Sequence, residues 1–154
     1  MGTTLTAALL NGTRATVAQV GDSRAYLFRG GSLILLTQDQ TIGNLLRSRG
    51  EDSERVSSQI KEMLTQAVGA QPDIEVTMSA IDLEPGDVML LCSDGLYKPV
   101  SPGEIVDCLE QPASAGQKAR NLVMKANGNG GPDNITVILA EIQLVEKTLS
   151  RAKG

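Results

Sequence analysis

The hydrophobic pattern of the first third of the chain consists of short β-rich runs separated by turn residues. The runs cover residues 3–10, 14–20, 24–29 and 32–36. Asn11-Gly12 between the first two runs is typical of a tight hairpin turn. Gly21-Asp22-Ser23 interrupts the pattern before the third run, and Gly30-Gly31 makes a second hairpin turn. The sequence therefore predicts four antiparallel strands in quick succession, arranged as a meander.

The apolar spacing changes to a helical period in the middle of the chain. Apolar residues recur at helical spacing in residues 42–46 and again in residues 56–64. The segment 47–55 between them is polar and charged, and Gly50 is a typical helix stop. We predict two short helices around a solvated loop, followed by a strand over residues 74–79.

One short stretch organises the rest of the chain. Val88 to Cys92 is apolar at every position and too short for a helix, which predicts a strand buried on both faces. Pro85-Gly86 introduces it as a turn, and it ends abruptly at Ser93-Asp94-Gly95. A carboxylate at that point is held rigidly at the rim of a core, although Asp94-Gly95 is also what a plain turn would contain.

The last third predicts two helices and a final strand. Ser101 as N-cap, Pro102 at the first helical position and Glu104 at the third complete a capping box. A second helix is expected over residues 113–126, and the last strand over residues 135–142. With about seven strands and four helices, this order predicts an α+β fold with an antiparallel sheet.

The length and composition fit one globular domain. A chain of 154 residues forms one domain, which we place at residues 1–145, with a charged and frayed tail at 146–154. Aromatic residues are limited to Tyr26, Phe28 and Tyr97, so the core must be aliphatic.

Several classes of function are excluded by what the chain lacks. It contains no histidine, so it cannot build a Ser-His-Asp triad or a His-ligated zinc site. The net charge of −4 gives no basic surface for nucleic acid. No stretch has the length or character of a membrane span. Cys92 and Cys108 lack metal-type spacing and are expected to be reduced, buried thiols in a cytoplasmic protein.

Three aspartates share one local setting, at the end of a strand and next to turn residues. They are Asp22, Asp94 and Asp133. If they converge, their carboxylates repel unless cations neutralise them, and oxygen ligands without His or Cys favour Mg²⁺ or Mn²⁺. Paired ions of this kind activate a water and bind a phosphoryl group. Three unrelated turn aspartates remain the alternative.

Five segments, in order, resemble the metal-dependent PPM/PP2C family of protein serine/threonine phosphatases. The matching segments are Met1-Gly-Thr-Thr4, Val20-Gly-Asp-Ser-Arg-Ala-Tyr26, Leu64-Thr-Gln-Ala-Val-Gly69, Leu91-Cys-Ser-Asp-Gly-Leu96 and Gly131-Pro-Asp-Asn-Ile-Thr136. The resemblance implies a layered β-sandwich of antiparallel sheets flanked by helices, incomplete at the N-terminus. It also implies that residues 42–61 form the flap region near the active site.

The resemblance implies a ligand set and a reaction. Asp94 and Asp133 would bind a binuclear Mg²⁺ or Mn²⁺ centre, Asp22 a more weakly held third ion, and a metal-activated water would hydrolyse phosphoserine or phosphothreonine in a protein substrate. The family's Asp-Gly-x-Gly-Gly-His-like segment, with the bridging aspartate, has no counterpart in this sequence, so we expect the chain to be weakly active or inactive alone. The alternative is a non-catalytic interaction module that pairs its open sheet with a partner or with another copy of itself.

Overall fold

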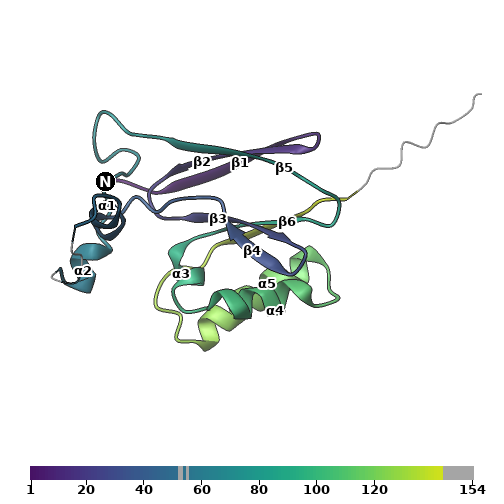
Figure 1. Cartoon of the computed structure of the whole chain (residues 1–154). Helices are drawn as coiled ribbons and strands as arrows, with labels where there is room; N and C mark the ends of the chain where they lie inside the picture. The colour runs from purple at the N-terminus through teal and green to yellow at the C-terminus, as the bar shows by residue number, and fades with distance from the viewer. Residues whose placement is uncertain (52–53, 55, 144–154) are drawn as a thin grey trace, which may run out of the picture.

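The computed structural model describes residues 1–51, 54 and 56–143 (Figure 1). The strands in this part of the chain are β1 (Leu5–Asn11), β2 (Arg14–Val20), β3 (Arg24–Arg29), β4 (Ser32–Leu35), β5 (Thr77–Asp82), β6 (Val88–Cys92) and β7 (Val137–Glu141). The helices are α1 (Ile42–Ser48), α2 (Ser58–Lys61), α3 (Asp94–Tyr97), α4 (Pro102–Glu110) and α5 (Ala115–Gly128). The tail predicted at 146–154 and the end of the predicted domain at 144–145 lie outside the described residues.

The strands form two antiparallel sheets, which confirms the predicted α+β sandwich and corrects the predicted meander. One sheet has the order β1-β2-β5, and the other has the order β4-β3-β6-β7. The two hairpins β1–β2 and β3–β4 therefore belong to different sheets, and the chain crosses between them at Gly21-Asp22-Ser23. Gly21 has φ 101°, and a Cβ there would lie 2.4 Å from Thr4 Cγ2, so the crossing needs glycine.

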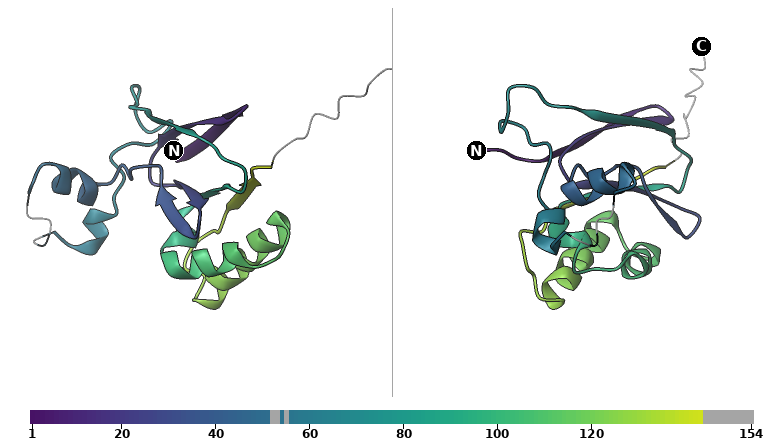
Figure 2. Two further views of the ribbon diagram at one scale, coloured as in Figure 1. Left: turned by 45° about the vertical axis from the view of Figure 1, so that its right-hand side comes forward. Right: turned by 60° about the vertical axis from the view of Figure 1, so that its left-hand side comes forward.

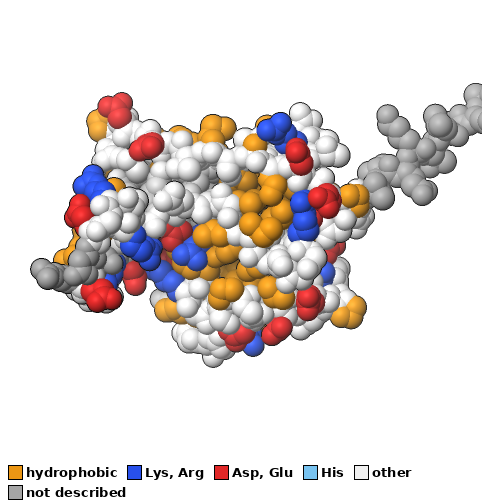
Figure 3. All heavy atoms as spheres, viewed as in Figure 1, with side chains coloured by type: hydrophobic (Ala, Val, Ile, Leu, Met, Phe, Trp, Pro, Cys, Tyr) orange, Lys and Arg blue, Asp and Glu red, His pale blue; other side chains and the backbone are white. Residues whose placement is uncertain are grey.

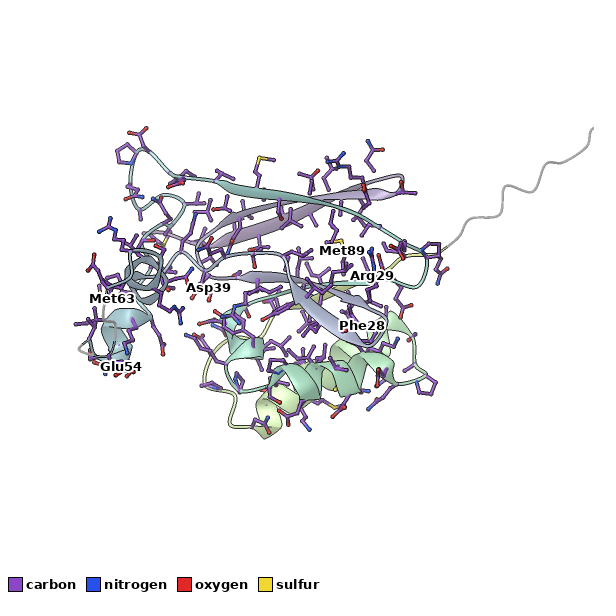
Figure 4. All side chains as sticks on the ribbon, in the orientation of Figure 1. Phe28, Arg29, Asp39, Glu54, Met63 and Met89 are labelled. Carbon is purple, nitrogen blue, oxygen red and sulfur yellow. The ribbon has the colours of Figure 1, made fainter. Side chains whose placement is uncertain are left out.

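The molecule is built in three layers, with the two sheets stacked and the helices α3, α4 and α5 below one of them (Figures 1 and 2). The core between the two sheets is aliphatic and includes Leu27 and Met89. The second core lies between the four-stranded sheet and the helices and includes Leu90 and Leu122. Figure 4 shows Met89 on the side of β6 that faces the other sheet. Helices α1 and α2 lie apart from these layers, beside one end of the sandwich (Figure 1).

Strand β6 lies at the centre of the larger sheet and is buried on both faces, as its unbroken apolar run predicts. Val88 and Leu90 face the helices, and Met89 faces the second sheet. The capping box at the start of α4 is also present, with Ser101 Oγ accepting from the Glu104 backbone amide and Glu104 accepting from the Ser101 amide. Both elements therefore follow directly from local sequence.

Two predictions of local structure differ from what is observed. The strand expected at 74–79 begins only at Thr77, because the preceding segment forms a loop in which the Glu75 amide donates to Gln66 Oε1 at 3.2 Å. The expected turn at Asp94-Gly95 is the first turn of the short helix α3. In the described part of the chain no helix has both the length and the apolar character that crossing a membrane requires.

Candidate metal centre

The pairing of strands brings the predicted site residues to one end of the four-stranded sheet. Arg24 at the start of β3 and Val137 at the start of β7 both pair with Cys92, the last residue of β6. Asp22 lies two residues before β3, and Asp94 lies two residues after Cys92. The segment that contains Asp133 leads into β7. Sheet register thus places all three aspartates around the end of β6.

Asp22 and Asp94 interact electrostatically. Burial raises the pKa of Asp22, and the neighbouring Asp94 carboxylate raises it further. Lys98 opposes both effects by favouring the ionised form of Asp22. The two carboxylates thus form a pair that is easier to keep charged when a cation is close.

Asp133 is held near this pair through the backbone. A Cβ on Gly95 would lie 2.4 Å from the Asn134 carbonyl oxygen, so the start of α3 packs directly on the segment that follows Asp133. Ser93 Oγ donates to the Asn134 carbonyl at 2.9 Å. The Asp133 carboxylate accepts a hydrogen bond from the Asn134 amide at 2.7 Å. The absence of a side chain at Gly95 therefore makes this close approach possible.

Lys98 connects Asp94 to the C-terminal end of α2. Its Nζ lies 2.9 Å from Oδ2 of Asp94 and 3.1 Å from Oε2 of Glu62, the residue that follows α2. The hydrogen bond to Asp94 is the main cause that raises the pKa of Lys98. The ammonium therefore stays charged and balances part of the negative charge of the site.

Arg24 and Tyr97 form a network of contacts next to Asp22. The Arg24 guanidinium forms a bidentate pair with Asp39, at 2.9 Å to Oδ1 and 2.7 Å to Oδ2. Its central carbon lies 3.6 Å from the centroid of the Tyr97 ring, within the range of a cation–π contact. The Tyr97 hydroxyl donates to the Asp22 carbonyl at 3.0 Å. This network fixes the backbone that carries Asp22.

The sequence interpretation missed four of these residues. Arg24 is part of the Gly-Asp-Ser-Arg motif, but the motif alone does not indicate its role. Tyr97 and Lys98 follow Asp94 at spacings of three and four, which place them on the same side of a helix, and that signal was available. Asp39 carries no local signal, because its partner Arg24 is 15 positions away.

A polar cleft of about 260 Å³ opens between the α1–α2 region and the rest of the molecule. Figure 3 shows Lys and Arg side chains beside Asp and Glu side chains along the hollow next to the α1–α2 region. Figure 4 shows Asp39 at this end of the sandwich. The lining residues include Asp22, Arg24, Asp39, Arg47, Lys61 and Lys98.

The donor set fits Mg²⁺ or Mn²⁺ in kind but not in number. Carboxylate oxygens are the ligands that these ions prefer. However, within residues 1–51, 54 and 56–143 no three His, Cys, Asp or Glu side chains are grouped closely enough to hold an ion together. The described residues therefore form an incomplete ligand set.

Comparison with known proteins gives the class to which this fold and site belong. The family model of Protein phosphatase 2C matches residues 1–46. The relatives described next extend this similarity to the PP2C, or PPM-type, family of protein phosphatases over almost the whole chain.

The relatives cover almost the whole chain. The serine/threonine phosphatase stp of Listeria welshimeri is 39% identical over 149 residues, which is 96% of this chain and 59% of that protein. The structure of the S. agalactiae serine/threonine phosphatase superimposes with a TM-score of 0.85 at 34% identity, over 91% of this chain and 59% of that one. The catalytic domain of the phosphatase PstP, solved with two manganese ions, gives a TM-score of 0.80 at 38% identity over 93% and 60%. The chain thus spans about three-fifths of the length of these relatives.

Proposed function

We propose that the chain is part of the catalytic domain of a cytoplasmic protein serine/threonine phosphatase that uses Mg²⁺ or Mn²⁺. The observation that carries the proposal is the strand register at the end of β6, where Arg24 and Val137 both pair with Cys92 and the segments that carry Asp22, Asp94 and Asp133 meet. Carboxylates gathered in this way are stabilised by a bound cation. The manganese ions in the PstP structure support the choice of metal, and the two buried, unbonded cysteines support a reducing compartment.

In this proposal the metal would activate a water and neutralise charge on the phosphoryl group of a phosphoserine or phosphothreonine protein. The chain supplies the groups that hold it. Asp94 and Asp133 bind the main centre, and Asp22 binds a third ion more weakly. The Tyr97 hydroxyl and the Arg24 guanidinium position the Asp22 segment through the contacts described above.

The chain alone is expected to show very weak or no phosphatase activity. Its described carboxylates do not form a complete ligand group, and the resemblance implies a further aspartate that has no counterpart in this sequence. Release of phosphate from a phosphothreonine peptide in the presence of Mn²⁺ measures this directly. Robust turnover by the purified chain would overturn the expectation.

Calorimetric titration with Mn²⁺ tests the proposed metal site. The chain should bind Mn²⁺, and binding should be lost in both Asp94→Asn and Asp133→Asn. Asp107→Asn is the matched control, because Asp107 is an exposed carboxylate on α4 outside the site. If the folded chain does not bind Mn²⁺, or if Asp107→Asn is as harmful as the site variants, the proposed metal role of this chain is wrong.

A second candidate function is a non-catalytic regulatory or interaction module derived from a phosphatase. The incomplete ligand group among the described residues favours it. The two candidates differ in how far they depend on the metal site. A phosphatase would lose its activity in Asp94→Asn, whereas an interaction module would still bind its partner.

A further inference from the structure

Two basic residues of the polar cleft beside α1 and α2 have no acidic partner among the described residues. Four cationic side chains line this cleft: Arg24, Arg47, Lys61 and Lys98. The positive charges of Arg24 and Lys98 are balanced by the carboxylates described above. The ion pairs in the described part of the chain include neither Arg47 nor Lys61. The α1–α2 side of the cleft therefore carries uncompensated positive charge.

Arg47 is held in place by an amide instead of a carboxylate. Its Nη2 donates to Asn44 Oδ1 at 3.2 Å, and Asn44 Nδ2 in turn donates to the Asp39 carbonyl at 2.8 Å. Arg47 and Asn44 are three positions apart on α1, so they are neighbours on one side of the helix. The amide oxygen orients the guanidinium without neutralising it. Its other N–H groups remain able to bind a carboxylate in the bidentate manner typical of arginine.

Lys61 is placed beside Arg47 by the close packing of α2 on α1. A Cβ on Gly43 would lie 3.0 Å from the Lys61 Cβ and 3.1 Å from the Lys61 carbonyl oxygen. Gly43 and Arg47 are four positions apart, and so the side of α1 that carries Arg47 is the side that meets Lys61. The Lys61 side chain is half-buried. Two cations from neighbouring helices thus line one cleft (Figure 3).

The size and charge of the cleft fit one acidic side chain. Its volume of about 260 Å³ is below the roughly 300–1,000 Å³ of sites that enclose a small molecule or cofactor. Two neighbouring positive charges repel each other, and an anion close to both relieves that repulsion. Asp22 of the candidate metal centre lines the same cleft. A polypeptide whose phosphorylated residue reaches that centre would therefore place a nearby residue at Arg47 and Lys61.

We propose that Arg47 and Lys61 form a specificity subsite for an acidic side chain, aspartate or glutamate, of the phosphoprotein substrate. In an extended segment, residues two or three positions from the phosphorylated one lie about 7–10 Å away from it. The inference rests on the proposed function and narrows its substrates to proteins with acidic residues near the phosphorylated site. The two cations select the substrate and take no part in the chemical step.

The test is a titration of the isotope-labelled chain with synthetic peptides, followed by NMR without added metal. The peptides share one phosphothreonine and differ only two and three positions to either side of it, where they carry aspartate, asparagine or phosphoserine. We expect the aspartate peptide to bind about fivefold more tightly than the asparagine peptide, since exposed ion pairs are individually weak. The amide shifts that change should be those of α1 and α2.

The double variant Arg47→Gln/Lys61→Gln should reduce this preference to less than twofold. The matched control is Arg49→Gln/Arg120→Gln, which removes the same charge from two exposed residues outside the cleft. The control should keep the preference. Because the wild-type chain is compared across peptides, the result remains decisive even if the double variant does not fold.

Equal binding of the aspartate and asparagine peptides overturns the proposal, and so does an equal loss in the control variant. Amide shifts confined to elements other than α1 and α2 also overturn it. A preference for the phosphoserine peptide alone contradicts the assignment to a carboxylate. A chain that prefers the aspartate peptide but binds no Mn²⁺ would support the subsite and contradict the proposed metal function, whereas Mn²⁺ binding without the preference would do the reverse.

Discussion

The Arg29–Asp87 pair is the most sharply defined ionic contact outside the site, and its removal should destabilise the fold measurably. Arg29 Nε and Nη2 donate to Asp87 Oδ1 and Oδ2 at 2.8 and 2.6 Å. Asp87 Oδ2 also accepts from the Glu84 amide at 2.7 Å. The Asp87 side chain is 2% exposed, while that of Arg29 is 31% exposed. Figure 4 shows Arg29 at the end of the sandwich away from Asp39.

Asp87→Asn replaces one accepting oxygen by an amino group that faces N–H donors. Hydrogen bonds to charged groups contribute about 1.5–3 kcal/mol each, but the exposed guanidinium recovers part of its hydration. We therefore expect a loss of about 2 kcal/mol in the free energy of unfolding. For a domain of this size, that loss lowers Tm by roughly 4–8 °C.

Urea unfolding followed by circular dichroism measures this change. Asp82→Asn is the matched control, because Asp82 is exposed and contributes its backbone carbonyl, not its carboxylate, to Arg29. A loss below about 0.5 kcal/mol in Asp87→Asn, the scatter typical of surface changes, or an equal loss in both variants, would refute the reasoning.

The same pair predicts a pH dependence with a definite sign. The hydrogen bond from Arg29 lowers the pKa of Asp87 below the ordinary 3.8, against the opposing effect of burial. The stabilisation is therefore complete above pH 3.8 and is lost as the pH falls through the lower folded-state pKa. The difference in the free energy of unfolding between the wild-type chain and Asp87→Asn should therefore shrink as the pH falls below 3.8 and through the folded-state pKa of Asp87.

Three further substitutions test other parts of the structure. Lys98→Met should tighten Mn²⁺ binding by roughly fivefold in calorimetry, because it removes a cation that competes for a site carboxylate, while Lys61→Met should change it less. Gly95→Ala should cost about 1–3 kcal/mol in urea unfolding through the clash with the following segment, whereas Gly103→Ala, with open space around its Cβ, should be tolerated. Ser101→Ala should cost about 1 kcal/mol by the same assay, and an unchanged midpoint would show that the capping box is unimportant.

Elements set by local sequence were predictable, and those set by pairing between distant segments were not. The burial of β6 and the start of α4 follow from residues within a few positions of each other. The assignment of the first two hairpins to separate sheets does not, because the alternation of β2 and β3 is the same in a meander and in a sandwich. Only the break at Gly21-Asp22-Ser23 indicated the change, and its composition also fits an ordinary turn.

The candidate site divides in the same way. The placement of Asp22, Asp94 and Asp133 near one end of the sheet could be predicted because each stands where a strand begins or ends, and the sheet then aligns those ends; their role as metal ligands stays a prediction. Lys98 could have been found from its helical spacing to Asp94. The partnership of Arg24 with Asp39 depends on tertiary packing, and no periodicity in the sequence encodes it.

The scarcity of aromatic residues gives the chain an unusual optical property. It contains no tryptophan and only two tyrosines. The Tyr26 hydroxyl accepts a hydrogen bond from Arg24 at 3.0 Å, and the Tyr97 ring lies under the same guanidinium. All intrinsic ultraviolet fluorescence from tyrosine therefore originates beside the candidate site. Tyrosine emission can thus report events at this end of the sheet without an introduced label and without background from the rest of the fold.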